Sequence, residues 1–152
     1  MNIIFNKEQN LFYVASVAAV FITGINFASA GVNVILTGEK EVPSVITNAI
    51  GESNIKVATD TSISGTVTTT GMEGTAAHIH EGPPGKNGPV IITLKKVSDK
   101  IWEVPPGTRL TEGQYANYKS GNLYLNVHSA TYKSGEIRGQ ISDNRLSHNL
   151  KK

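Results

Sequence analysis

The sequence predicts an all-β fold, a sandwich or barrel of about eight short strands, and three observations support this. Short runs rich in β-branched and aromatic residues recur along the chain, Gly, Pro and Asn separate them, and a helical pattern occurs in one place. The predicted strands are residues 32–37, 53–59, 63–69, 76–80, 90–95, 101–104, 123–128 and 136–141. The predicted helix covers residues 111–119, with Thr111 as its N-cap and Gly121 as its stop signal.

Composition limits the classes of function. The chain has 152 residues, of which 39% are hydrophobic, and this suits one domain with its own core. Its net charge is +2 and no dense stripe of Lys or Arg is present, so we expect no nucleic-acid partner. It has no Cys, which excludes thiol catalysis, a blue-copper site and a lipid anchor on cysteine.

The N-terminal segment has the pattern of a secretory signal peptide. Lys7 precedes an apolar run over residues 11–22, and Ala28-Ser29-Ala30 follows as a cleavage site. We therefore predict a signal peptide over residues 1–30, one domain over residues 31–142, and a secreted, periplasmic or cell-surface location with no membrane span after cleavage. An uncleaved membrane anchor is the alternative. The last residues, 143–152, are polar and are predicted to be a disordered tail.

Three histidines form the strongest candidate site. His78 and His80 are two positions apart in a predicted strand, so their side chains share one face, with β-carbons about 7 Å apart. His128 ends another predicted strand. Three imidazoles that converge are a ligand set that zinc and copper accept, and the sequence therefore predicts a copper or zinc site at His78, His80 and His128. The alternative is a hydrogen-bonded histidine cluster that holds the Gly/Pro-rich loop and binds no metal.

Glu136 is predicted to support this site. If residues 123–128 and 136–141 form a hairpin, His128 lies opposite Glu136, Asn126 opposite Arg138 and Tyr124 opposite Gln140. Glu136 would then be a fourth ligand or would accept a ring N–H from a ligating histidine. Glu41 is a weaker candidate for the same site. Arg138 would steer anions or form a salt bridge with Glu136 or another carboxylate.

The mature chain resembles the CHRD domain, which was first described as a repeat in chordin and is widespread in microbial secreted proteins. The resemblance covers about residues 32–141, and it departs from the family pattern at Ser44 and Glu81. It rests on motifs that occur in the family's order: Leu36-Thr37-Gly38, Glu41-Val42-Pro43, Ala77-His78-Ile79-His80, Gly88-Pro89-Val90, Gly121-Asn122-Leu123-Tyr124-Leu125-Asn126-Val127-His128 and Gly135-Glu136-Ile137-Arg138-Gly139-Gln140. It implies an extracellular antiparallel Greek-key β-sandwich, loosely similar to copper-zinc superoxide dismutase, and defines no activity.

The function is therefore open between two main hypotheses. The first is a metal-binding protein that serves metal storage, sensing or structural stabilisation. The second is an extracellular module that binds a protein or polysaccharide, with a structural histidine cluster. A dismutase-like enzyme is a weaker hypothesis, because the domain offers no fourth histidine and no cluster of Asp for a second metal. A zinc hydrolase is also a weaker hypothesis, because no substrate pocket can be identified from the sequence. We assign no catalytic residue.

Overall fold

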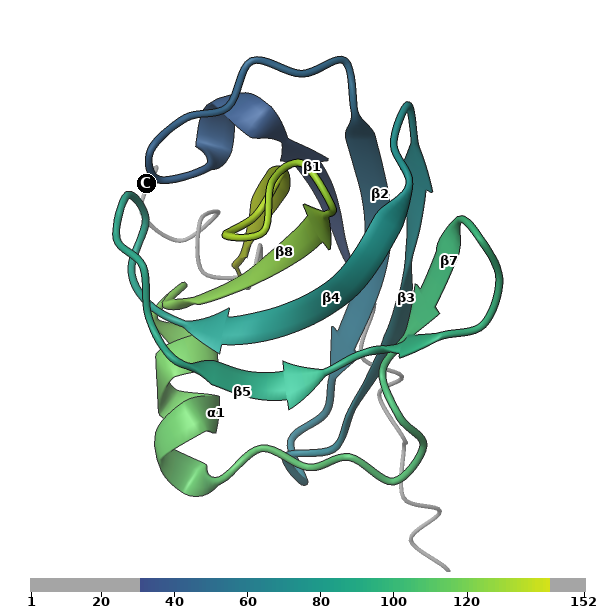
Figure 1. The fold of residues 1–152 in the computed structure, drawn as a ribbon. Coiled ribbons are helices and arrows are strands. Elements are labelled where there is room, and N and C mark those ends of the chain that lie inside the picture. The colour runs from purple at the N-terminus through teal and green to yellow at the C-terminus, as the bar shows by residue number, and fades with distance from the viewer. Residues whose placement is uncertain (1–30, 143–152) are drawn as a thin grey trace, which may run out of the picture.

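Residues 31–142 are described by a computed structural model, and their strands form one antiparallel sheet. The strand order is β5-β4-β8-β9-β1-β2-β3-β7-β6. The sheet curves until it is nearly closed, so that β4 and β8 lie across from β2 and β3 (Figure 1). The predicted all-β class is confirmed, and the sandwich is approximate because one continuous ladder of strands makes both halves.

The elements follow the predicted order closely. They are β1 (Val32–Thr37), a 3-10 turn η1 (Gly38–Lys40), β2 (Ile50–Val57), β3 (Ile63–Thr70), β4 (Gly74–Glu81), β5 (Val90–Thr93), β6 (Lys95–Lys96), β7 (Ile101–Glu103), α1 (Glu112–Lys119), β8 (Leu123–Ser129) and β9 (Ile137–Ile141). The helix begins where the sequence predicted, because the Thr111 side chain accepts a hydrogen bond from the Gln114 backbone N–H and Gln114 bonds back to Thr111.

The predicted strand over residues 90–95 is wrong in one respect, because the structure divides it into β5 and β6. Thr93 pairs with His78 of β4, whereas Lys95 pairs with Glu103 of β7. The strands β5 and β6 thus lie at opposite ends of the strand order. The segment therefore crosses from one edge of the sheet to the other at Leu94, which is buried.

Apolar side chains on alternate positions build the core inside the curved sheet. Leu36 of β1, Ile55 of β2, Ile79 of β4, Leu125 of β8 and Ile137 of β9 are all fully buried there. In β2 the buried and exposed positions alternate strictly, as expected for a strand with one face in the core. The period-2 pattern of the sequence thus decides which side of each strand faces inward.

The outer face of β8 and β9 is also covered, by the segment from η1 to Ala49 and by the turn between β4 and β5. Tyr124, Asn126 and Arg138 point to this second face, yet each is only 2% exposed. Hydrogen bonds hold this layer in place. Asn87 Nδ2 donates to the Val42 carbonyl and so joins the two covering segments, and Gln140 Nε2 donates to the Gly82 carbonyl and so joins β9 to the turn between β4 and β5. The molecule therefore has a buried polar layer in addition to its apolar core, and the three histidines border this layer.

The predicted signal peptide and the predicted disordered tail lie outside the described residues. Within residues 31–142, no helix has the length and apolar character needed to cross a membrane.

Candidate metal centre

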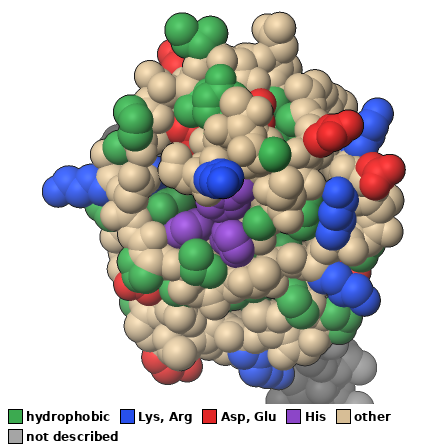
Figure 2. All heavy atoms as spheres, in the orientation of Figure 1, with side chains coloured by type: hydrophobic (Ala, Val, Ile, Leu, Met, Phe, Trp, Pro, Cys, Tyr) green, Lys and Arg blue, Asp and Glu red, His purple; other side chains and the backbone are tan. Residues whose placement is uncertain are grey.

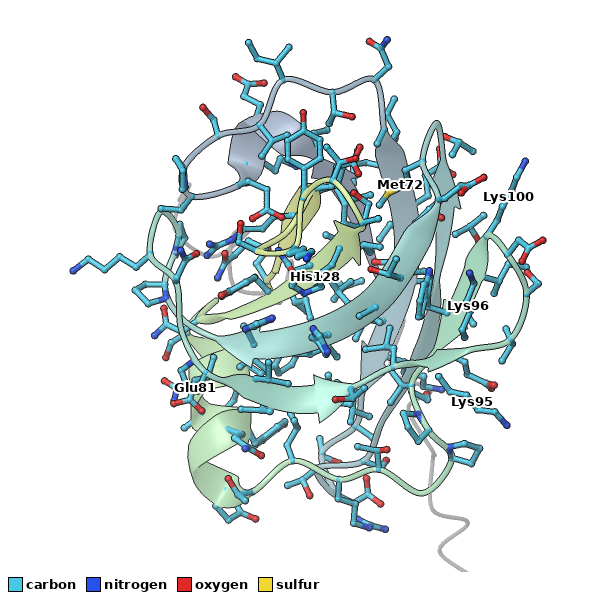
Figure 3. The ribbon with its side chains drawn as sticks, viewed as in Figure 1. Met72, Glu81, Lys95, Lys96, Lys100 and His128 are labelled. Carbon is cyan, nitrogen blue, oxygen red and sulfur yellow. The ribbon has the colours of Figure 1, made fainter. Side chains whose placement is uncertain are left out.

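Antiparallel pairing of β4 with β8 brings the three histidines together. Ala76 pairs with His128 and His78 pairs with Asn126, so His78 and His128 are diagonal neighbours on the same face. His78 Nδ1 lies 2.8 Å from His128 Nε2, and one ring nitrogen from each histidine lies within 4.8 Å of the other two. The rings gather at the surface of the face drawn in Figure 2, and Figure 3 labels His128 among them. The three predicted residues therefore converge.

Backbone carbonyls set the tautomers of two of the rings. His80 Nδ1 lies 2.9 Å from the Gly88 carbonyl oxygen, and His128 Nδ1 lies 2.9 Å from that of Lys133. A carbonyl only accepts, so each Nδ1 carries the proton and each Nε2 keeps its lone pair. His128 Nε2 then accepts the Nδ1–H of His78. Of these two Nε2 lone pairs, that of His80 has no hydrogen-bond partner among the described residues, whereas that of His128 is used by His78. An unprotonated imidazole nitrogen is the form that binds a metal.

The surroundings of the three histidines favour their neutral form. Burial lowers the pKa of His78, of His80 and of His128 below the ordinary value of 6.5. The neighbouring histidines lower the pKa of His78 further, and for His80 and His128 a hydrogen bond to a backbone carbonyl partly opposes the effect of burial. A metal competes with a proton for the same lone pair, so lower pKa values favour metal binding in mildly acidic solution.

Gly88 joins the turn after β4 to this centre. Its carbonyl accepts from His80 Nδ1, and its N–H donates to the Tyr124 hydroxyl at 3.1 Å. Its backbone lies so close to Glu81 that a β-carbon at position 88 would overlap the Glu81 carbonyl oxygen. Glycine at this position therefore allows the turn to approach β4 closely enough to orient His80.

A column of stacked side chains supports His80 from the other side. The Tyr124 ring stacks on the His80 ring, with centroids 4.7 Å apart and planes 8° from parallel. The Arg138 guanidinium lies on Tyr124, with Cζ 3.5 Å from the ring centroid.

Sequence reasoning predicted a steering role or a salt bridge for Arg138. The structure instead directs its donors to Asn87 Oδ1 at 3.1 Å, the Lys86 carbonyl at 2.8 Å and the Pro83 carbonyl at 3.4 Å.

The two carboxylates considered from the sequence do not join the three converging histidines. Glu136 is buried and its Oε1 accepts from Thr47 Oγ1 at 2.7 Å. The β8–β9 pairs place Asn126 opposite Arg138 and Tyr124 opposite Gln140 as predicted, but the ladder ends at Val127–Ile137, one pair before His128 and Glu136. The Lys133 carbonyl takes the acceptor position that we expected Glu136 to have.

Glu41 lies in the buried polar layer, where its Oε1 accepts from Asn126 Nδ2. Burial raises the pKa of Glu41 from 4.5 to about 7, and this effect outweighs the opposing charge of Arg138 and the hydrogen bonds from Val42 and Asn126. The Glu41-Val42-Pro43 motif was a weak indication of a site role for Glu41, but no local pattern indicated that its side chain is buried.

Replacing Glu41 by glutamine should stabilise the domain at pH 8 and have little effect at pH 4.5. A carboxyl whose pKa is raised by folding stabilises the folded state below its unfolded pKa, and this contribution is lost as pH rises from 4.5 to about 7. Glutamine keeps the shape without the charge, so we expect a gain of at most about 3 kcal/mol at pH 8. Urea unfolding of both proteins at the two pH values measures it, and an equal effect at both would contradict the assignment.

No curated protein and no solved structure matches this chain significantly. A family model does match. The matching model describes the CHRD domain, and the match covers residues 32–141, from the first residue of β1 to the last residue of β9. The matched residues include all three histidines, the turn after β4 that contains Gly88, and the stacked side chains of Tyr124 and Arg138. The chain therefore belongs to the CHRD domain family.

Proposed function

We propose that this protein binds one copper or zinc ion through His78, His80 and His128. The observation that carries the proposal is the hydrogen bonding of the two ring nitrogens of His80. Its Nε2 is buried and has no hydrogen-bond partner among the described residues, while its Nδ1 is fixed by the Gly88 carbonyl. A buried nitrogen without a partner costs free energy, and a metal ion would supply the partner for its lone pair.

The spacing of the rings supports the same proposal. Nitrogens around a tetrahedral zinc lie about 3.3 Å apart, given Zn–N bonds of about 2.0–2.1 Å. The present distances bracket this value, from 2.8 Å between His78 and His128 up to the 4.8 Å limit for the cluster. For Nδ1 of His78 to bind the ion, its proton would move to Nε2 of the same ring, which keeps the imidazole neutral. The two nitrogens of the former hydrogen bond would then separate by about half an ångström, which small side-chain rotations would provide.

The chemistry of the donors selects the class of metal. Imidazole nitrogens suit zinc and copper, whereas calcium and magnesium require oxygen ligands. Glu136 and Glu41 are bonded elsewhere, so the protein supplies three donors and leaves a fourth position for a ligand from solution. Metal storage, sensing or stabilisation of an exported domain agrees with this site, and the signal-peptide pattern of the N-terminus supports export.

Metal analysis of the mature chain, purified without a histidine tag, tests the proposal. The protein is incubated with excess copper or zinc, desalted, and analysed for bound metal. We expect about one ion per chain in the wild type and a loss of at least ten-fold in retained metal for His80→Ala, because a missing ligand of three leaves a weak two-donor site.

His148→Ala is the matched control, because it removes the one histidine of the chain that lies outside the described residues. This variant should retain metal as the wild type does. Equal loss in both variants, or no retained metal in a folded wild type, would overturn the proposal. The second result would favour the interaction-module hypothesis, in which the histidines only hold the loop.

A further inference from the structure

Asn126 is the most deeply buried amide near the histidine cluster. It is 2% exposed, lies two residues before His128 on β8, and pairs directly with His78 of β4 on one side and with Arg138 of β9 on the other. Its Nδ2 donates to the Glu41 carboxylate. Its Oδ1 is buried and has no hydrogen-bond partner among the described residues.

The contacts of Nδ2 indicate the side on which Oδ1 lies. A β-carbon on Gly135, in the connection that leads into β9, would overlap Nδ2, so the nitrogen occupies the β9 side of the amide. The amide is planar, and its oxygen is therefore turned away from Gly135. The neighbour of β8 on the side away from β9 is β4, where His78 pairs with Asn126. The same outer face thus carries two buried acceptors without partners, His80 Nε2 and Asn126 Oδ1.

We propose that Asn126 Oδ1 accepts a hydrogen bond from an oxygen ligand at the fourth position of the metal, so that the centre prefers a ligand that carries hydrogen, such as water, to an anion that carries none, such as azide. This inference rests on the proposed function. An uncharged amide whose nitrogen is already committed to Glu41 offers only an acceptor to the metal ligand. It therefore stabilises bound water and gives nothing to azide.

The test is the affinity of the copper-loaded protein for azide, followed through the azide-to-copper charge-transfer band. Asn126→Leu keeps the size of the side chain and removes the acceptor. Azide must displace water, and loss of a typical hydrogen bond to that water should tighten azide binding about five-fold. Asn126→Ser, whose hydroxyl is too short to reach the ligand, should show the same change and covers the case in which leucine prevents folding.

Glu41→Gln is the matched control, because it changes the partner of Nδ2 and leaves Oδ1 in place. Azide affinity in this variant should equal that of the wild type. An unchanged affinity in a folded Asn126 variant that still holds one copper would overturn the inference alone, whereas a wild type that holds no copper would overturn the proposed function first.

The wild type provides a second measurement that needs no substitution. When its asparagine carboxamide carbons carry ¹³C, pulsed electron paramagnetic resonance of bound copper should detect a weak coupling to a carboxamide. Absence of any such coupling would contradict the inference.

Discussion

Arg138→Leu should lower the free energy of unfolding by about 3–5 kcal/mol, because it removes a buried charge around which a whole turn is organised. The guanidinium donates to Asn87 Oδ1 and to the carbonyls of Pro83 and Lys86, and it lies on the ring of Tyr124. Leucine would remove all three donors and the contact with the Tyr124 ring, so the turn would lose the hydrogen bonds that hold it on β9. Urea denaturation at constant pH measures the loss.

Arg138→Lys is the matched control, because it separates the effect of the positive charge from the effect of the planar guanidinium donors. Lysine keeps the positive charge but not the planar set of donors, so we expect a loss between those of the wild type and the leucine variant. The charge of Arg138 also lowers the pKa of Glu41. The leucine variant should therefore lose less stability at pH 5, where Glu41 is protonated, than at pH 8. A loss below about 1 kcal/mol at both pH values would show that the turn does not depend on Arg138.

Gly88→Ala should weaken both the fold and metal binding. The added β-carbon would overlap the Glu81 carbonyl oxygen, so the turn must move away from β4, and the hydrogen bonds of Gly88 to His80 and Tyr124 would be lost. We expect a loss of about 2–3 kcal/mol in the free energy of unfolding. Retained copper should fall at least ten-fold, since the ring of His80 would no longer be oriented.

Gly85→Ala in the same turn separates this effect from a general cost of replacing glycine. Gly85 has a φ of +76° and nothing lies within 4 Å of a β-carbon built on it. Alanine there should cost about 1 kcal/mol through backbone strain alone and leave metal retention unchanged. Equal copper loss in both variants would show that His80 does not depend on the close approach at Gly88.

Local pattern was sufficient to predict most of the strands, the helix and the pairing of Asn126 with Arg138 in the hairpin. Alternating burial along β2, the capping box at Thr111 and the pairing of Asn126 with Arg138 all depend on residues that are near one another in sequence or on strict period-2 geometry. For the same reason, the shared face of His78 and His80 followed from their spacing alone. The convergence of His128 on them needed the β4–β8 pairing, which links residues fifty positions apart.

Local pattern failed where partners come from distant segments. Glu136 was expected beside His128, but Thr47, 89 residues away in sequence, provides the hydroxyl that bonds it. Glu41 and Asn126, 85 residues apart, meet in the buried polar layer. The division of residues 90–95 into two strands has the same origin, because β5 pairs with β4 and β6 with β7, so that the two halves form opposite edges of the sheet.

The sequence by itself therefore determined the all-β class, the faces of the strands, the family and the three candidate ligands, since these depend on side-chain alternation and on short motifs. The tertiary structure alone decided that two tautomers are set by the carbonyls of Gly88 and Lys133, that Arg138 holds a turn through a stack on Tyr124, and that both carboxylates are bonded away from the histidines. These features depend on how two loop segments cover the outer face of β8 and β9. That packing is set by contacts of long sequence separation, which no local periodicity encodes.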